Sequence, residues 1–196
     1  FFFLLFSCGI NAQQLESLKI LKIKHDSIET QLKLKYQEEI KGKSESEISE
    51  IYYQNLLSRS KNNRERLDHY FSAVQTYLET QKLIGPSQEA AQQEIPDKTA
   101  NYSQGFPALY KEVHDFIKNQ YQDRLDEFFT KSAKIHFIVQ NDHSLYIEKV
   151  EGTEKEFNDL ALLAFLMTTG KWESAFQRGM NVKSKFVLPV KFVVEE

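Results

Sequence analysis

Residues 133–152 read AKIHFIVQNDHSLYIEKVEG. On either side of a polar turn at residues 141–144, apolar side chains alternate with polar ones, at Ile135, Phe137, Val139, Leu145 and Ile147. A period of two is typical of a half-buried β-strand, because successive side chains point to opposite faces. The stretch therefore predicts a β-hairpin.

A helix is expected directly after the hairpin. Thr153 and Glu156 have the spacing of a capping box, and apolar residues follow at helical intervals up to Gly170, at Phe157, Leu160, Ala161, Ala164 and Phe165. Residues 185–194 then alternate again, with Pro189 on one face and Phe186, Leu188, Val190, Phe192 and Val194 on the other. This second alternation predicts a third strand.

The order strand, strand, helix, strand restricts the topology of the sheet. The helix reverses the chain after the second strand, so the third strand runs parallel to the second. A fully antiparallel sheet then requires the first strand in the middle. Pro189 agrees, because a residue without a backbone N–H is confined to an edge strand or a bulge. An edge strand leaves a row of backbone groups available to a partner.

The residues before the hairpin predict a further helix and a linker. Pro107 would lie in the first turn of the helix, whose apolar positions are Phe106, Leu109, Tyr110, Val113, Phe116 and Ile117. Leu125, Phe128 and Phe129 suggest one more short helical turn. Residues 85–104 carry hardly any large apolar side chain, which predicts a flexible linker and a domain boundary.

Residues 14–84 have helical periodicity. One stripe follows Leu18, Leu21, His25, Ile28 and Leu32, and Gly42 can end that helix. Ser44 and Glu47 form a capping box, and further stripes follow Ile48, Ile51, Tyr52 and Leu56, then Leu67, Tyr70, Phe71, Val74 and Leu78, up to Gly85-Pro86. The pattern allows one helix or two broken near residues 60–63. We expect an antiparallel helical hairpin or bundle, followed by an α+β domain at 105–196 with a three-stranded antiparallel sheet packed against helices.

Residues 1–13 resemble the end of an export signal. An apolar run at residues 1–6 precedes Cys8, which is a lipidation candidate in a lipobox-like context, while Ala12 offers an ordinary cleavage site instead. The run is shorter than the roughly 20 residues that cross a bilayer. A spanning helix whose beginning is missing is the alternative. We expect an exported protein, periplasmic or anchored to the envelope.

Residues 105–194 resemble the TonB C-terminal domain, in a divergent form common in Bacteroidetes-like envelope proteins. The matching pieces are Phe137-Ile138-Val139, Val150-Glu151-Gly152, Phe157-Asn158, Gly170-Lys171-Trp172, Gly179 and Leu188-Pro189-Val190-Lys191-Phe192. The chain departs from the family pattern at Tyr121-Gln122, at Ser174-Ala175 and in the turn at Asn141, which lacks the usual Gly. Trp172, Gly179 and Pro189 would be structural residues of the motif, with Trp172 a core residue rather than a stacking platform.

The resemblance implies a periplasmic protein that engages a segment of an outer-membrane transporter by strand addition to the third strand. The partner-binding residues would be Lys185, Phe186, Val187, Leu188, Val190, Lys191, Phe192, Val193 and Val194. Two alternatives stay open. The chain could belong to a complete TonB-type energy transducer with its membrane helix truncated, or the helices could act as a coiled-coil adaptor.

Composition and motifs argue against other classes of function. A formal charge of −3 gives no basic surplus for nucleic acid. The seven glycines are scattered, the one cysteine excludes an intramolecular disulfide, and no cysteine pair or His-Glu-x-x-His helix could hold zinc. His136, Asp142 and His143 could approach across the hairpin, but such residues are more often exposed to solvent. We expect no catalytic site, no cofactor and no metal.

Overall fold

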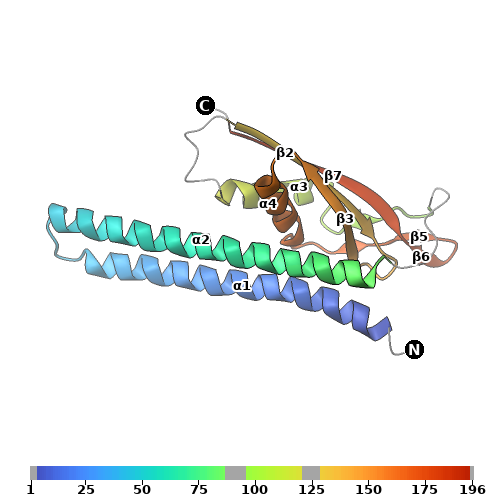
Figure 1. Cartoon of the computed structure of the whole chain (residues 1–196), viewed down its shortest axis with the longest axis horizontal. Helices are drawn as coiled ribbons and strands as arrows, with labels where there is room; N and C mark the ends of the chain where they lie inside the picture. Colours follow the sequence, from blue (N-terminus) through green and yellow to red (C-terminus); the bar gives the residue numbers. More distant parts are fainter. Residues whose placement is uncertain (1–3, 87–95, 121–128, 195–196) are drawn as a thin grey trace. The chain divides into compact units, whose positions relative to one another are not determined.

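The computed structural model describes residues 4–86, 96–120 and 129–194 (Figure 1). The chain divides into two compact units, a helical unit of residues Gln14–Ala73 and a sheet unit built on residues Val74–Glu196. The predicted class is confirmed at the level of α+β, with helices first and an antiparallel sheet with its own helices second. Because the division falls at Val74, the last turns of the second helix belong to the sheet unit, not to the helical unit as predicted.

The helical unit is a pair of antiparallel helices. Helix α1 spans Leu4–Glu39 and α2 spans Glu45–Ile84 as one continuous helix, which answers the question left open near residue 60. The Asn55 amide donates to the Leu32 carbonyl, and Arg59 bonds Glu29. The contacting residue numbers therefore increase along α2 as they decrease along α1, as expected for two antiparallel helices.

Helix α2 begins and ends with the expected signals. The backbone N–H of Ser44 donates to Glu47 Oε2 at 3.0 Å, which is the return bond of a capping box. This bond, with the Ser44 hydroxyl and Lys43 adding to it, lowers the pKa of Glu47 to about 2. At the other end Gly85 adopts φ +70° and its N–H donates to the Gln81 carbonyl.

The apolar stripe predicted for the first half of α2 is partly wrong. Tyr52 and Leu56 are exposed, whereas Asn55, Arg59 and Asn62 contact α1. Apolar periodicity could not detect this face, because polar side chains pair with polar partners there.

The main sheet has the predicted topology. Strands β2 (Phe129–Val139), β3 (Leu145–Gly152) and β7 (Ser184–Val194) are antiparallel in the order β3-β2-β7, so the first strand of the hairpin is central. Pro189 lies opposite Lys134 on the edge strand β7. A register shift between His136 and Phe137 interrupts the pairing of β2 with β3.

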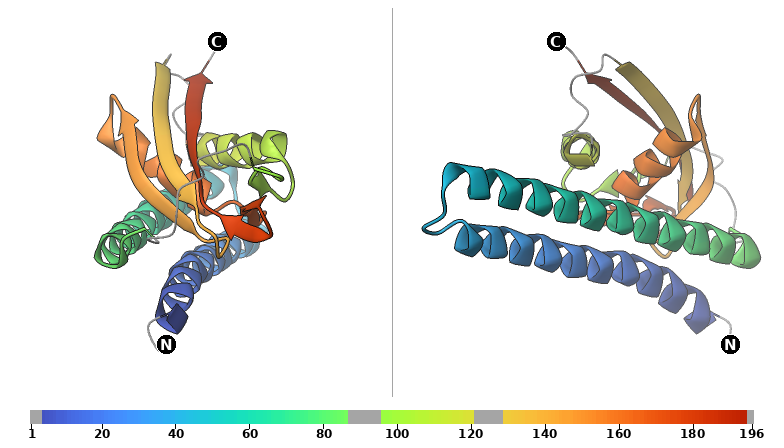
Figure 2. Two further views of the ribbon diagram at one scale, coloured as in Figure 1. Left: turned by 90° about the vertical axis from the view of Figure 1, so that its right-hand side faces the viewer. Right: turned by 60° about the vertical axis from the view of Figure 1, so that its left-hand side comes forward.

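Helices α3 (Phe106–Gln120) and α4 (Lys155–Leu166) cover one face of the sheet (Figure 2). The predicted capping box of α4 is wrong, because the N-cap is Glu154 and no side chain caps it. Trp172 is 7% exposed and lies in the core among aromatic rings, those of Tyr102, Phe106, Phe137, Phe165 and Phe186.

Four short strands were not expected. They are β1 (Asn101–Tyr102), β4 (Trp172–Glu173), β5 (Ala175–Gln177) and β6 (Met180–Val182). Strand β1 pairs with β4, and β5 forms a hairpin with β6 through Arg178 and Gly179, both at positive φ. Such a pair of positive φ angles matches the twist of a two-residue hairpin turn.

The flexible-linker prediction is wrong for residues 98–104. Lys98 exchanges two backbone hydrogen bonds with Phe176, and Tyr102 is buried with its hydroxyl bonded to Glu112. These residues are ordered by segments distant in sequence, which local composition does not reveal. The rest of the predicted linker up to residue 95, and the predicted helical turn up to Phe128, lie largely outside the described residues. Phe129 itself begins β2.

Candidate protein-binding edge of the sheet

Strand β7 has one edge on β2 and a second edge that pairs with no strand in the described part of the chain. Gln140 donates its N–H to Ser144, so even-numbered residues of β2 direct their backbone groups toward β3 and odd-numbered residues toward β7. By the register of the two strands, even-numbered residues of β7 bond to β2 and odd-numbered ones face outward. The outward backbone groups thus belong to Lys185, Val187, Pro189, Lys191 and Val193.

The side chains of β7 divide into two sets. Leu188, Val190 and Phe192 are buried on the helix-covered face. Val187 is 52% exposed and Val193 38%, and Lys185, Pro189 and Lys191 share their open face. Of the predicted binding residues, Leu188, Val190 and Phe192 therefore cannot contact a partner with their side chains, which instead pack β7 onto the core. The side chain of Val194 lies outside what the structure describes.

An ion pair crosses the open face of the sheet near the start of β7. Lys185 Nζ lies 2.7 Å from Glu148 Oε1 on β3, so the pair spans the central strand. Ile138 lies directly opposite Lys185 and is buried although it is on the open face. The aliphatic stem of a lysine can cover such a side chain while its ammonium stays in water.

The opposite edge of the sheet, on β3, is occupied by the end of α2 (Figure 1). Gln81 Nε2 donates to the Leu145 carbonyl at 2.6 Å, and Gln81 Oε1 accepts the Ile147 N–H at 2.9 Å. Tyr77 donates its hydroxyl to the same Leu145 carbonyl, and burial raises its pKa. The two edges thus differ among the described residues: the outer edge of β7 pairs with no strand, whereas two outward backbone groups of β3 are bonded to Gln81.

The structure does not bring the candidate metal ligands together. His136 bonds Glu151 across the open face of the sheet, and His143 Nδ1 accepts the Ser174 N–H at 3.0 Å. The pKa of Glu151 is lowered, first by its hydrogen bond to Lys149 and then by His136. Asp142 bonds Ser144 within the turn. Within the described residues no group of three such side chains could hold a metal ion.

His143 explains why the turn tolerates the absence of a glycine. It has φ +69°, a value that favours glycine. Its side chain and backbone both bond Ser174, so the turn is fixed to the segment after Trp172.

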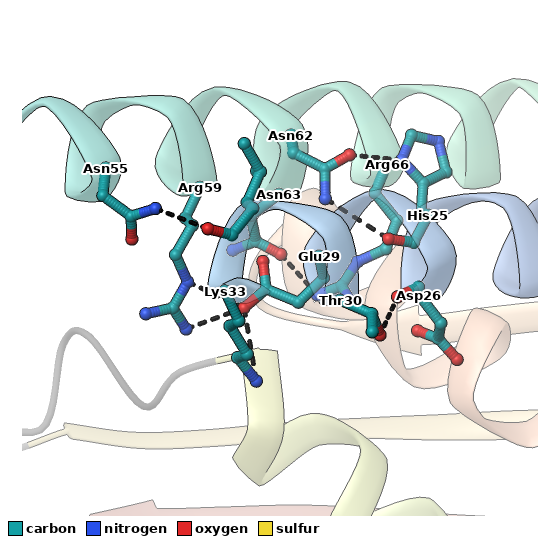
Figure 3. A network of polar contacts seen from close by, with 11 residues as sticks. His25, Asp26, Glu29, Thr30, Lys33, Asn55, Arg59, Asn62, Asn63 and Arg66 are labelled. Atoms are coloured by element: carbon teal, nitrogen blue, oxygen red, sulfur yellow. Dashed lines mark hydrogen bonds and ion pairs between the residues drawn. The ribbon is translucent and has the colours of Figure 1, made fainter. Parts of the chain in front are cut away.

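A polar cluster in the helical unit was missed by sequence reasoning (Figure 3). Asn62 Nδ2 donates to the His25 carbonyl, so Asn62 Oδ1 is the acceptor for His25 Nδ1–H at 2.9 Å. His25 Nε2 lies 3.1 Å from His69 Nδ1, and a neutral His25 with its proton on Nδ1 accepts a hydrogen bond there. His25 is buried, and the apolar stripe on which it was predicted is here a polar contact.

The predicted lipidation residue, Cys8, lies in α1, and its side chain is outside the described part of the structure. No helix in the described ranges has the length and apolar character needed to span a bilayer.

Comparison with known proteins found no relative of this chain. No protein family, no curated protein and no solved structure matches the chain.

Proposed function

We propose that the sheet unit binds an extended segment of another protein by strand addition to β7. The observation that carries the proposal is that the outer edge of β7 pairs with no strand in the part of the chain that the structure describes. Backbone donors and acceptors on such an edge pair with any extended chain, while alternate side chains select among candidates. We do not propose an enzyme, because the polar side chains described above, such as His136 with Glu151 and His143 with Ser174, hydrogen-bond one another and connect parts of the fold.

The side chains beside the open edge favour an acidic partner. Lys185, which also pairs with Glu148, and Lys191 share one face of β7, with the exposed Val187 between them. Cross-strand pairs of opposite charge stabilise a sheet and like charges opposite one another destabilise it. A segment with acidic residues six positions apart and a β-branched residue between them therefore fits this edge. Antiparallel self-pairing of two β7 strands in the register that places Lys185 opposite Lys191 would instead bring lysines together.

The TonB-like pattern suggests where such a partner would be found. We propose a segment of an envelope or outer-membrane transporter, met by this chain after export. The full energy transducer and the helical adaptor remain alternative proposals. The adaptor has a specific observation in its favour, since Tyr52, Tyr53, Leu56 and Leu57 are exposed on α2.

The proposal is tested with a synthetic probe and amide exchange. The probe is a capped peptide of about nine residues that alternates Val and Thr and carries Glu at its second and eighth positions; the control peptide carries Lys there. We expect the Glu peptide alone to bind, and to slow exchange at Lys185, Val187, Lys191 and Val193. Phe186, Leu188 and Val190 should change little, because their N–H groups already bond β2.

A matched pair of variants tests the mechanism at one position. Val193→Pro removes an outward donor and should weaken probe binding by about two- to tenfold, the range for one hydrogen bond. Val193→Thr keeps the donor and should bind as the parent does. Both must keep the parent circular dichroism. Protection of residues 45–83 with an unchanged β7 would refute strand addition and favour the adaptor.

A further inference from the structure

Gln81 is placed as if it were a residue of a fourth strand. A strand residue offers its neighbour one N–H and one C=O. The Gln81 side chain does the same for β3, because its amide N–H donates to the Leu145 carbonyl and its carbonyl accepts the Ile147 N–H. Both contacts lie within the sheet unit. One side-chain amide thus pairs two outward backbone groups of β3 as a residue of an added strand would.

The surroundings of Gln81 hold the amide in place. Its second N–H donates to the Tyr77 hydroxyl at 2.8 Å, and Tyr77 lies one helical turn earlier on the same face of α2. The side chains of Gln81 and Tyr77 are 4% and 3% exposed. A buried amide with three of its hydrogen-bonding positions filled has little freedom to leave the edge.

We infer that Gln81 determines which edge of the sheet accepts a partner: it closes β3 against extended chains and so confines strand addition to β7. The claim that strand addition is confined to β7 rests on the proposed function. The claim that Gln81 closes β3 does not depend on it. An unpaired edge is a site of unwanted pairing in any sheet, and proteins commonly cover it. Here the cover comes from α2, whose first part belongs to the other unit.

The test compares Gln81→Met with Gln75→Met in the full chain. Methionine keeps the length of the side chain and loses its hydrogen bonds, and Gln75 is an exposed residue on the same helix. We expect Gln81→Met to speed exchange of the Ile147 amide by about tenfold, since that N–H loses its acceptor. It should also bind two Glu probe peptides at saturation where the parent and Gln75→Met bind one. If the exchange of Ile147 or the stoichiometry stays at the parent value, the inference is overturned.

A second variant guards against simple unfolding. Gln81→Asn keeps the amide but is one methylene shorter, so it cannot reach Leu145 and Ile147 together. It should show the same faster exchange and second peptide with parent-like circular dichroism. If only Gln81→Met has these effects, general loosening explains them and the inference fails.

Failure of the proposed function gives a distinct result. If the Glu probe binds neither the parent nor the variants, strand addition to β7 is wrong. The closure of β3 is then decided by sedimentation: self-association of Gln81→Met and Gln81→Asn, with Ile147 protected in the associated form, supports it. Variants that stay monomeric with the parent overturn it.

Discussion

At the scale of single residues, Tyr102 links three segments of the sheet unit. Its hydroxyl donates to Glu112 on α3 at 2.9 Å and accepts the Gly170 N–H at 2.6 Å. Glu112 also accepts the Thr169 N–H at 2.7 Å. Burial raises the pKa of Tyr102, so the phenol stays protonated and can keep its donor role. This network holds the end of α4 against α3 and places Trp172 in the core.

Gly170 is required by a close approach to this tyrosine. A Cβ added at Gly170 would lie 2.3 Å from Tyr102 Cζ. We expect Gly170→Ala to lower the free energy of unfolding by about 1–3 kcal/mol, as overpacking does. It should also change the fluorescence of Trp172, the one tryptophan, whose ring centroid is 5.5 Å from that of Tyr102.

Gly179→Ala is the control for this prediction. No atom of the described residues lies within 4 Å of the added Cβ, but φ is +83°. The substitution should cost about 1–2 kcal/mol through the backbone alone and leave the emission of Trp172 unchanged. A parent-like emission for Gly170→Ala would contradict the packing argument.

Glu47 should make the start of α2 sensitive to acid. Its pKa is lowered to about 2 from 4.5, first by the Ser44 N–H, so the charged form is favoured in the folded chain. The resulting stabilisation is complete above pH 4.5 and is lost as the pH falls toward 2. Carboxyl chemical shifts of Glu47 followed by NMR should give the low pKa directly.

Glu47→Gln provides the comparison. It should remove the part of the acid dependence of helix unfolding that lies between pH 4.5 and 2, measured by circular dichroism. Because Glu47 is exposed, the change will be small. An NMR midpoint near the ordinary glutamate value would show that the capping bond is not kept in solution.

At the scale of elements, the contact between α1 and α2 is polar in its middle. His25 and Asn62 are buried and bond each other there, and Glu29 with Arg59 follows one turn along α1. A buried donor that loses its acceptor costs more than the bond itself contributes. The pair therefore disfavours any register of the two helices that separates His25 from Asn62.

Removal of one partner should be worse than removal of both. Asn62→Ala leaves the His25 Nδ1–H buried without an acceptor and should cost about 1–3 kcal/mol. The double variant His25→Leu/Asn62→Leu should be close to the parent, because both polar groups are gone. Urea unfolding followed by helical circular dichroism measures both. Equal losses in the single and double variants would show that packing, not the hydrogen bond, governs this contact.

At the scale of the whole molecule, the sheet unit begins before the segment that composition marked as its boundary. Tyr77 and Gln81 tie the end of α2 to β3, and Lys98 and Tyr102 tie residues 98–104 to the segment around Trp172. Removal of everything before Gly105 would therefore delete parts of the fold. A binding fragment should start at Val74 or earlier.

Limited trypsin digestion should respect this boundary. Lys98 is a trypsin site, but its backbone pairs with Phe176 and its ammonium lies 2.8 Å from Glu173. We expect early cuts at exposed lysines of the helical unit and none after Lys98, as read by mass spectrometry of the products. An early fragment beginning at Thr99 would contradict the observed pairing. Trypsin cleavage after Lys171, beside Trp172, serves as the internal comparison and should also be slow, because Lys171 bonds Ser103.

The sequence by itself determined those elements whose apolar residues recur with a regular period. Period-two alternation located β7 to within one residue, and Pro189 predicted that β7 lies at the edge, because both signals are local properties of a strand. The order of elements predicted the central place of β2. The candidate binding edge was therefore predictable from the sequence.

Only the tertiary structure decided which residues far apart in sequence contact one another. Gln81 on an edge of β3, Asn62 beside His25, and Tyr102 beneath Gly170 join residues far apart in sequence. A glutamine or asparagine on a helix has no periodic signature, since its role depends on one partner and not on a repeated face. Hydrogen-bond geometry in three dimensions supplies that partner, as it does where Gln81 bonds Leu145 and Ile147 on β3.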